Sequence, residues 1–297
     1  MPSGILIINK PAGWTSHDVV ARLRGLFKER RIGHGGTLDP MATGVLPIFV
    51  GRATRAVDFA MRGDKEYIAG FRPGIITDTQ DITGTVLETR PSDLSISSLK
   101  AVLSRFQGDI LQLPPMYSAI KRDGKKLYEL ARRGKTVARD PRPVTISELT
   151  YLDRSKTGDY LLQVVCSKGT YIRTLCHDIG TALGCGGAMA SLLRTRSSEF
   201  TLNQAVTLQA VEEAAARGEA ASLLLPVDRC FSAYPPLFAG PDQARLCRNG
   251  ALVPLEGDPG IYRVYEETTG AFLLLGQLER DENGRGHIRT IKSFYEV

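Results

Sequence analysis

The 297-residue sequence has few of the residues that build metal centres or disulfide frameworks. Its five cysteines are odd in number and include no Cys-x-x-Cys pair, which disfavours both a disulfide framework and a structural zinc site. Its four histidines show no His-Glu-x-x-His spacing, so we expect no catalytic metal. The GHGGT stretch at 33–37 lacks the Gly-Lys-Ser/Thr that places a lysine on the phosphates in a nucleotide-binding loop. Any chemistry must therefore use other side chains.

Long apolar runs are absent as well. The N-terminal segment has only one short run, Ile5 to Ile8, which is too brief for a targeting signal, and nothing approaches the length of a membrane span. We therefore expect a cytoplasmic protein. A hydrophobic content of 42% and a charged content of 24% are ordinary for a globular chain. The length favours one large domain with a smaller one.

Positive charge is unevenly distributed along the chain, whose net charge is +6. Residues 231–297 hold seven Lys/Arg and nine Asp/Glu, a net of −2, so residues 1–230 carry +8. Residues 121–142 contain nine bases and three acids, and residues 22–31 contain five bases and one acid. Two such clusters indicate a polyanionic partner, most simply a nucleic acid. A solvated helix face is the alternative for either cluster taken alone.

The stretch from Gly33 to Gly51 is the candidate for the chemistry. It holds five glycines in nineteen residues and a single carboxylate, Asp39. Pro40 restricts the backbone at Asp39, and the apolar residues that follow Gly44 predict a core strand. A lone acid on a stiffened loop beside a core element is how a nucleophile or general base is presented. An ordinary Asp-Pro turn is the alternative that this stretch alone leaves open.

The apolar periodicity predicts an α+β fold, because strands and helices do not alternate strictly. Strands are expected at 4–9, 65–72, 85–88, 143–152 and 160–167, with two more short strands within 188–202. Helices are expected after a Ser16 cap, at 52–62, at 97–106, after Gly169, and from a Thr207 cap to Ala216. Four short strand candidates follow Pro235, at 251–254, 262–265, 271–275 and 288–293, so the C-terminal part is expected to be a small β-rich domain.

Residues 112–142 read as a basic insertion. It opens with a Pro-Pro turn, contains an Asp123-Gly124 reverse turn, and continues into a short helix from Leu127 to Arg133. Tyr117 and Tyr128 lie between the bases. Bases bind phosphates and aromatic rings stack on nucleobases, so the insertion is typical of an arm that grips RNA.

Several long segments, in order and in register, resemble the TruB family of bacterial tRNA pseudouridine-55 synthases, relatives of dyskerin. They are INKPAGWTSHDVV, GHGGTLDPMATGVLPIFVG, KEY, TDTQDITG, PPMYSAIKRDGKKLYELARRGK, SKGTYIRTLCHDIG and LLRTRS. The resemblance implies a catalytic domain at 1–234 with a mixed, mostly antiparallel sheet, the basic insertion at about 112–142, and a PUA-like RNA-binding domain at 235–297. The implied reaction converts uridine 55 of the tRNA T-loop to pseudouridine without cofactor, metal or guide RNA. A monomer is expected, and tRNA-folding chaperone activity is a rival or companion function.

The resemblance also implies roles for individual residues. Asp39 would be the nucleophile, Arg173 would pair with it and keep it ionised, and Tyr67 would stack on the uracil and accept the C5 proton. His34 would hold the target base out of the RNA. Substrate-binding residues would be Tyr171 and Leu193, which line the pocket, and Lys125, Lys126, Arg132 and Arg133 on the arm; Lys10 would have a structural or electrostatic role.

One residue departs from the family pattern. Pro73 stands where members usually have leucine, just beyond the strand that carries Tyr67. Proline cannot donate a ladder hydrogen bond, so that strand is expected to end early or to lie at an edge there.

Overall fold

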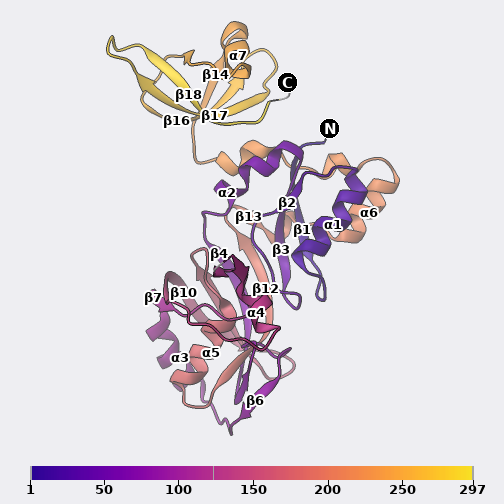
Figure 1. Cartoon of the computed structure of the whole chain (residues 1–297), viewed down its shortest axis with the longest axis vertical. Coiled ribbons are helices and arrows are strands. Elements are labelled where there is room, and N and C mark those ends of the chain that lie inside the picture. The colour runs from indigo at the N-terminus through magenta and orange to yellow at the C-terminus, as the bar shows by residue number, and fades with distance from the viewer. Residues whose placement is uncertain (1, 123, 296–297) are drawn as a thin grey trace.

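The computed structural model describes residues 2–122 and 124–295 of the chain. A nine-stranded sheet forms the body, with β1, β3, β12, β4, β11, β10 and β7 side by side in that order (Figure 1). β2 pairs with β3 and β13 pairs with β12. The strands are β1 (Gly4–Lys10), β2 (Ile32–His34), β3 (Thr43–Val50), β4 (Lys65–Pro73), β7 (Gly108–Gln112), β10 (Arg142–Arg154), β11 (Tyr160–Cys166), β12 (Gly187–Ser197) and β13 (Phe200–Thr201). β12 pairs with β3 in parallel and the remaining strand pairs of this sheet are antiparallel. The predicted α+β class with a mixed, mostly antiparallel sheet is confirmed.

The unbroken apolar runs in β1 and β3 arise because both faces of the sheet are covered there. Leu6 and Ile8 point into one core, which also receives helices from the same side, while Ile5 and Ile7 point into a second core on the other face. A strand buried on both faces cannot show polar alternation, so β1 reads as a continuous hydrophobic segment.

Helices pack against this sheet, lie in the basic insertion, or pack against the C-terminal part. They are α1 (Ser16–Phe27), α2 (Val57–Ala60), α3 (Ile96–Leu103), α4 (Leu127–Ala131), α5 (Ile172–Ala182), α6 (Leu208–Ala216) and α7 (Pro241–Arg248). α1 and α6 pack together beside β1 (Figure 1). No helix within 2–122 or 124–295 is both long and apolar enough to cross a membrane.

Two helix starts test the capping predictions. Thr207 caps α6 as predicted, since its side chain accepts the Ala210 N–H. The predicted Ser16 cap is wrong by one residue, because Thr15 and Asp18 form the capping box and Ser16 is the first helical residue. The Ser16 hydroxyl bonds the Leu38 backbone instead.

Two other sequence predictions need correction. The helix expected at 52–62 is a 3₁₀ turn, Gly51–Ala56, followed by the four-residue α2. The two short strands expected within 188–202 are one eleven-residue strand, β12, followed by the two-residue β13. β12 is long because it is central and pairs with β3 on one side and β4 on the other.

Pro73 ends β4, as its missing N–H requires. The pairing of β4 with β11 stops at Phe71, whereas its pairing with β12 continues to Pro73, which lies opposite Gly187. Pro73 therefore has a neighbouring strand on one side, and Gly74 follows with a φ of +82°. The expectation of an early end or a local edge is confirmed.

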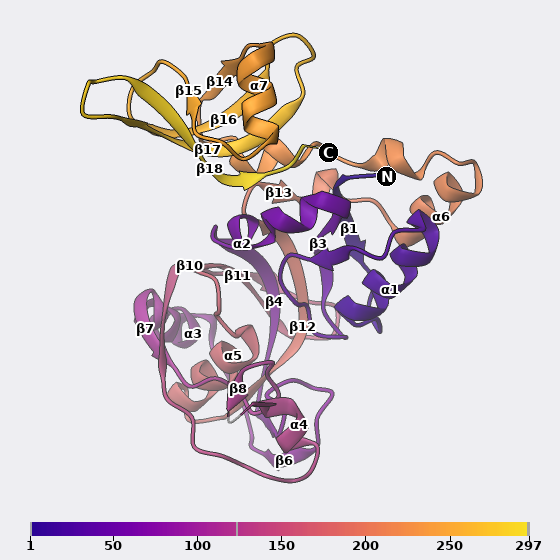
Figure 2. The same ribbon diagram turned by 45° about the horizontal axis from the view of Figure 1, so that its top comes forward.

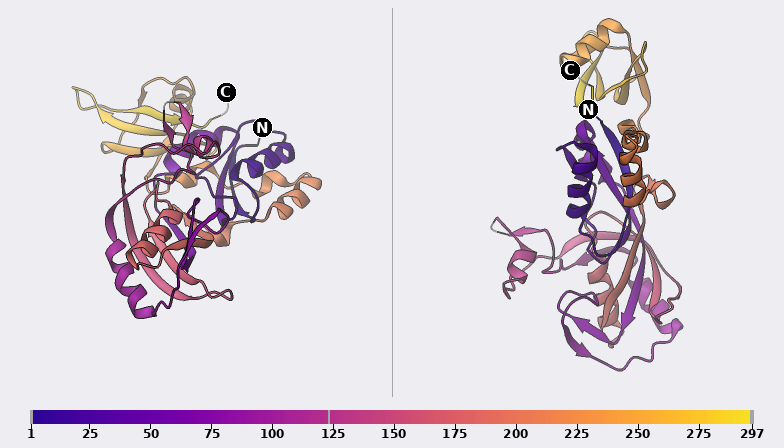
Figure 3. Two further views of the ribbon diagram at one scale, coloured as in Figure 1. Left: turned by 60° about the horizontal axis from the view of Figure 1, so that its bottom comes forward. Right: turned by 90° about the vertical axis from the view of Figure 1, so that its right-hand side faces the viewer.

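The basic insertion leaves the sheet between two strands that are paired at its root. Gln112 of β7 lies opposite Arg142 of β10, and the chain between them projects from the body (Figure 3, right). It carries a two-stranded hairpin, β8 (Lys121–Arg122) and β9 (Lys125–Lys126), and then α4. The helix ends at Ala131, two residues earlier than predicted, with a turn to Gly134. The predicted turn at Asp123-Gly124 includes Asp123, which lies outside the described residues.

The C-terminal part forms its own five-stranded sheet, β14 (Pro236–Ala239), β16 (Gly260–Glu266), β17 (Phe272–Arg280), β18 (Gly286–Ser293) and β15 (Val253–Pro254), in that order. The β-rich prediction is confirmed. α7 packs against this sheet (Figure 2) and the sequence reading missed it, although Gly240 and Pro241 form a usual helix start. A second hairpin, β5 (Ile75–Thr77) and β6 (Val86–Thr89), lies at the opposite end of the molecule (Figure 1).

Phe231 joins the two parts of the molecule. Its ring lies 5.3 Å from that of Phe59 in α2 and 5.4 Å from that of Phe294 after β18. Phe231 is 1% exposed, and its core includes residues of β1, β3 and the C-terminal sheet. The small β-rich part is therefore packed onto the body through a shared aromatic core.

Candidate active site

The Asp39 loop connects β2 to β3 and is fastened on both sides of the carboxylate. The Ser16 hydroxyl accepts the Leu38 N–H at 2.9 Å and donates to the Leu38 carbonyl at 3.2 Å. The Pro40 carbonyl accepts the Gly13 N–H at 2.8 Å and the Lys10 Nζ at 3.1 Å. The first turn of α1 and the end of β1 thus hold the residues before and after Asp39.

Gly44 allows this loop to enter the sheet. Its φ is +99°, which is unfavourable for a residue with a side chain. A Cβ at this position would lie 2.2 Å from the Arg194 carbonyl oxygen, inside van der Waals contact. Glycine therefore lets β3 approach β12 closely where the two strands pair in parallel.

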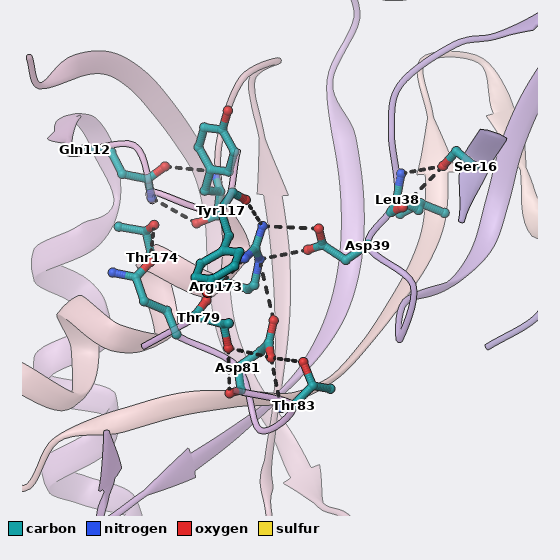
Figure 4. A network of polar contacts seen from close by, with 12 residues as sticks. Ser16, Leu38, Asp39, Thr79, Asp81, Thr83, Gln112, Tyr117, Arg173 and Thr174 are labelled. Carbon is teal, nitrogen blue, oxygen red and sulfur yellow. Dashed lines mark hydrogen bonds and ion pairs between the residues drawn. The ribbon is translucent and has the colours of Figure 1, made fainter. Parts of the chain in front are cut away.

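Arg173, near the start of α5, binds the Asp39 carboxylate through two nitrogens (Figure 4). Its Nε lies 2.8 Å from Asp39 Oδ2 and its Nη2 donates to Asp39 Oδ1 at 3.1 Å. The Arg173 side chain is 7% exposed and that of Asp39 is 32% exposed. The carboxylate therefore keeps one open side while the guanidinium is enclosed.

A second acid, Asp81, also lies beside the guanidinium. Its Oδ2 is 3.8 Å from Arg173 Nε, and its side chain is 6% exposed. Asp81 Oδ1 also accepts hydrogen bonds from the Thr79 hydroxyl and the Thr83 N–H, both at 2.9 Å (Figure 4). One arginine thus serves two carboxylates, of which only Asp39 is open to a ligand.

The groups around Asp39 have opposing effects on its pKa. Burial raises the pKa of the Asp39 carboxyl; Arg173 lowers it, Asp81 adds to the rise, and Lys10 lowers it. We expected the guanidinium to keep the acid ionised, but its effect moderates the rise in the Asp39 pKa without reversing it. Burial also lowers the pKa of Lys10 to about 8, with Asp39 opposing this shift.

Lys10 is a buried structural cation. It is fully enclosed, and its Nζ donates to the carbonyls of Pro11, Trp14 and Pro40 at 2.9, 2.6 and 3.1 Å. These bonds fold the segment after β1 against the Asp39 loop. Their pattern agrees with the structural or electrostatic role expected for Lys10.

Tyr67 lies in the middle of β4, beside Arg194 of β12 in the strand register. Arg194 is 1% exposed and donates to the Val45 and Gly36 carbonyls at 2.7 and 3.0 Å. It makes no ion pair with any carboxylate in the part of the chain that the structure describes. Burial raises the pKa of the Tyr67 phenol, and this uncompensated cation opposes the rise.

The structure does not bring Leu193 to the Tyr67 face of the sheet. Leu193 pairs with Ile68, whereas Arg194 pairs with Tyr67 and Leu192 with Ala69. Side chains alternate along a strand, so Leu193 points to the opposite face. Leu192 packs in the same core as Tyr67 and takes the position that we had assigned to Leu193.

His34 and Tyr171 lie at the edge of the group formed by Asp39, Arg173 and Asp81. The His34 ring contacts His17 edge-on at 5.3 Å, and its Nδ1 is buried without a hydrogen-bond partner among the described residues. Burial lowers the pKa of His34 to about 4, assisted by His17 and Arg194, so His34 is neutral at pH 7. Tyr171 is the residue before α5, two positions from Arg173, and burial raises its pKa.

The four arm bases chosen from the sequence lie away from Asp39, on the hairpin and the turn after α4. Lys125, Arg132 and Arg133 are exposed. The Arg132 guanidinium lies 5.3 Å and the Lys126 ammonium 5.5 Å from the centre of the Tyr128 ring. Tyr128 is therefore already in contact with two cations. At the base of the arm is a pocket of about 190 Å³, lined by Pro114, Ile120, Lys121, Arg122, Leu127, Ala138, Arg139, Asp140 and Arg142.

The second basic cluster, residues 22–31, is less available to an outside anion than its composition indicated, because several of its bases have partners within the protein. Arg22 pairs with Glu212 at 2.6 Å and Arg31 lies 3.6 Å from Glu29. Arg24 donates to the Ile32 carbonyl. Three of its five bases thus have partners within the protein, which favours the helix-face alternative for this cluster over a contact with a polyanion.

Sequence reasoning missed Asp81, Arg194 and Ser16. Asp81 lies in TDTQDITG, a segment that contributes to the family resemblance but in which we assigned no functional residue. The loop reaches the site because Gln80 has a φ of +65° and its carbonyl accepts the Met189 N–H. No spacing in the sequence reveals that contact. No group of three or more metal-ligating side chains occurs among residues 2–122 and 124–295.

Comparison with known sequences and structures assigns the chain. Residues 24–172 match the profile of the TruB family pseudouridylate synthase N-terminal domain, and residues 173–232 match that of the tRNA pseudouridylate synthase B C-terminal domain. The chain belongs to the TruB family. A tRNA pseudouridine synthase B from Stutzerimonas stutzeri is 42% identical over 94% of this chain and 92% of its own length. Another, from Syntrophotalea carbinolica, is 46% identical over 86% and 83%.

Solved structures share the fold of this chain. A chain from the crystal structure of a Cbf5–Nop10–Gar1 complex is 25% identical and superposes with a TM-score of 0.72, covering 98% of this chain and 85% of that one. A chain of an H/ACA RNP bound to a substrate RNA containing 2'-deoxyuridine is 24% identical, with a TM-score of 0.71. This TruB family chain is thus an isomerase with the pseudouridine synthase fold.

Proposed function

We propose that this chain converts uridine 55 in the T-loop of tRNA to pseudouridine, with Asp39 as the nucleophile. The named relatives act on tRNA. The observation that carries the residue assignment is the two-bond contact between Arg173 and the open carboxylate of Asp39. The reaction breaks the N1–C1′ bond, forms a C5–C1′ bond, and moves one proton from C5 to N1. No electron is gained or lost, so the conversion needs no redox cofactor.

Arg173 directs the Asp39 carboxylate and offsets its charge. A carboxylate held at both oxygens is fixed in plane and angle, which places its attacking oxygen for a single approach direction. Attack at C1′, attack on the base, and assistance to a glycal route all use this oxygen. Asp39 is therefore the common requirement of the three routes.

Tyr67 and Leu192 form the wall against the base. Tyr67 stacks on the uracil and is the favoured acceptor of the C5 proton, a role that phenylalanine could not fill. Burial favours the protonated phenol, and the adjacent Arg194 cation offsets this effect. Arg194 thereby lowers the pKa of the Tyr67 phenol towards the range in which its oxygen can act as a base.

The target uridine must leave the RNA stack to reach Asp39, which costs a few kcal/mol. His34 contributes as a neutral wedge, because its pKa of about 4 leaves it uncharged at pH 7. Tyr171 lines the pocket from the start of α5. Leu193 is not retained in this role, since it lies on the other face of the sheet.

The arm and the C-terminal sheet supply the RNA contacts. Lys125, Lys126, Arg132 and Arg133 bind backbone phosphates of the T-stem-loop, and the PUA-like part, residues 235–297, adds a second contact. The names of the relatives mention neither a guide RNA nor a partner chain, which supports action without a guide RNA, and we propose a monomer in the cytoplasm. Chaperone activity on tRNA would use the same arm.

Mass mapping of pseudouridine in bulk tRNA incubated with the purified protein tests the substrate. We expect one new pseudouridine, in the T-loop, and full reaction with a T-stem-loop hairpin. Reaction with ribosomal RNA fragments but not with the hairpin would overturn the substrate assignment.

A further inference from the structure

The root of the arm is bonded to the start of the helix that carries Arg173. Gln112, the last residue of β7, is 2% exposed. Its Oε1 accepts the Tyr171 N–H at 2.7 Å and its Nε2 donates to the Tyr171 carbonyl at 3.1 Å (Figure 4). One side-chain amide thus satisfies both backbone groups of the residue two positions before Arg173.

This contact supplies one bond of a helix cap, because it satisfies the N–H of the N-cap residue. Tyr171 occupies the N-cap position of α5, where a short polar side chain is preferred, and it makes no side-chain cap hydrogen bond. The start of α5 is therefore fixed by a residue from another element. Buried polar groups that lose such a partner incur the full desolvation penalty, so the geometry near Arg173 depends on Gln112.

The arm also contacts the guanidinium directly. The Tyr117 carbonyl accepts from Arg173 Nη2 at 2.9 Å, and this same nitrogen donates to Asp39 Oδ1. On the other side, the Thr79 carbonyl accepts from Arg173 Nη1 at 3.2 Å. Two loop carbonyls therefore fix the plane in which the guanidinium faces Asp39.

The peptides next to Tyr117 hold the start of α4. The Ser118 carbonyl accepts the Tyr128 N–H at 3.1 Å and the Ile120 carbonyl accepts the Leu127 N–H at 2.8 Å. A continuous series of hydrogen bonds thus runs from the arm helix, through residues 117–118, to Arg173. Displacement of the arm helix would therefore act on the Arg173 guanidinium through these hydrogen bonds.

We propose that Gln112 is a positioning residue through which the root of the RNA-binding arm sets the direction of Arg173. The inference rests on the proposed function, in which Arg173 orients Asp39. It makes the chemical step, and not only RNA affinity, depend on how the arm is seated. RNA bound to the arm can thereby influence Asp39 through hydrogen bonds that lie within the protein.

The decisive variant is Gln112→Met, which keeps the length of the side chain and removes both hydrogen bonds. The single-turnover rate of pseudouridine formation should fall between about tenfold and hundredfold, the cost of a small misplacement at a reacting centre. The dissociation constant for tRNA should change by less than about twofold, because no phosphate-binding base is altered. Gln107→Met is the matched control, since Gln107 donates a single bond to the Leu149 carbonyl and does not touch α5.

A double variant identifies the route of the effect. If Gln112 acts through Arg173, then Gln112→Met should slow the Arg173→Lys enzyme far less than it slows the wild type. Equal losses in both backgrounds, an unchanged rate in Gln112→Met, or a rate loss matched by lost tRNA affinity would each overturn the proposal. Gln112→Asn, which keeps the amide but is one methylene shorter, gives the same readout if the Met variant does not fold.

The outcome is separable from that of the proposed function. Activity that survives Asp39→Ala contradicts the proposed chemistry, whatever Gln112 does. An inactive Asp39→Ala beside a fully active Gln112→Met contradicts this inference alone.

Discussion

The catalytic centre and the arm differ in where their charges find partners. Around Asp39, the guanidinium of Arg173 is bonded to a carboxylate and to the carbonyls of Thr79 and Tyr117. On the arm, Lys125, Lys126, Arg132 and Arg133 make no ion pair with any described residue. The protein itself orders the first set, while the second set requires an anion from outside. Rate and affinity should therefore respond to different residues.

The largest effect is expected at the carboxylate. Asp39→Asn should reduce tritium release from C5-labelled uridine in tRNA by at least about 10⁴-fold, because the amide cannot act as the nucleophile. Binding of tRNA should persist, since the arm is unchanged. Release that continued at a comparable rate would rule out Asp39 as the nucleophile, and lost binding would show that the two regions are not separable.

Asp81→Asn should have the next largest effect. Loss of this charge removes one partner of Arg173 and should lower the rate between about tenfold and hundredfold. It also removes a cause that raises the Asp39 pKa, so the acid side of the pH–rate profile should move to lower pH. Asp78→Asn is the control, because Asp78 accepts the Thr85 N–H in the same loop but does not pair with Arg173. An acid limb that stayed in place would show that Asp81 does not influence Asp39.

Neutralising the arm should change affinity instead. Replacing Lys125, Lys126, Arg132 and Arg133 with alanine should weaken tRNA binding and reduce the slope of log K against log salt by about 3. The control removes four arginines that already pair with acids: Arg22, Arg90, Arg217 and Arg245. If both sets flatten the slope equally, only net charge matters and the comparison between the regions fails.

The smallest effect concerns stability near the site. His34 has a folded-state pKa of about 4, below its ordinary value, so the unfolded chain binds more protons between about pH 4 and 6.5. Stability should therefore fall as the pH decreases through that window, by an amount on the order of 1–3 kcal/mol. Denaturant unfolding of His34→Gln should show a smaller loss over the same range. Identical pH dependence in both proteins would mean that His34 is not buried as a neutral ring.

Patterns in the sequence located most elements because strands such as β11 alternate and helices such as α6 carry their caps. The candidate nucleophile and its arginine partner were found through motifs, and the structure brings them together. Leu193 shows the limit of this approach, because a shift of one residue in a strand exchanges the two faces. Asp81 shows another limit, since a loop contact with β12 depends on the left-handed backbone of Gln80 and leaves no periodic signal.

The position of Phe231 has a consequence for how the molecule holds RNA. Because this ring is shared between α2 and the strands of the C-terminal sheet, the separation between that sheet and Asp39 is set by a packed interior and not by a hinge. An RNA that contacts both the C-terminal sheet and the Asp39 site must therefore have its target uridine at a fixed distance from the nucleotides that contact the C-terminal sheet. Such a spacing would select substrates by shape before any base is recognised.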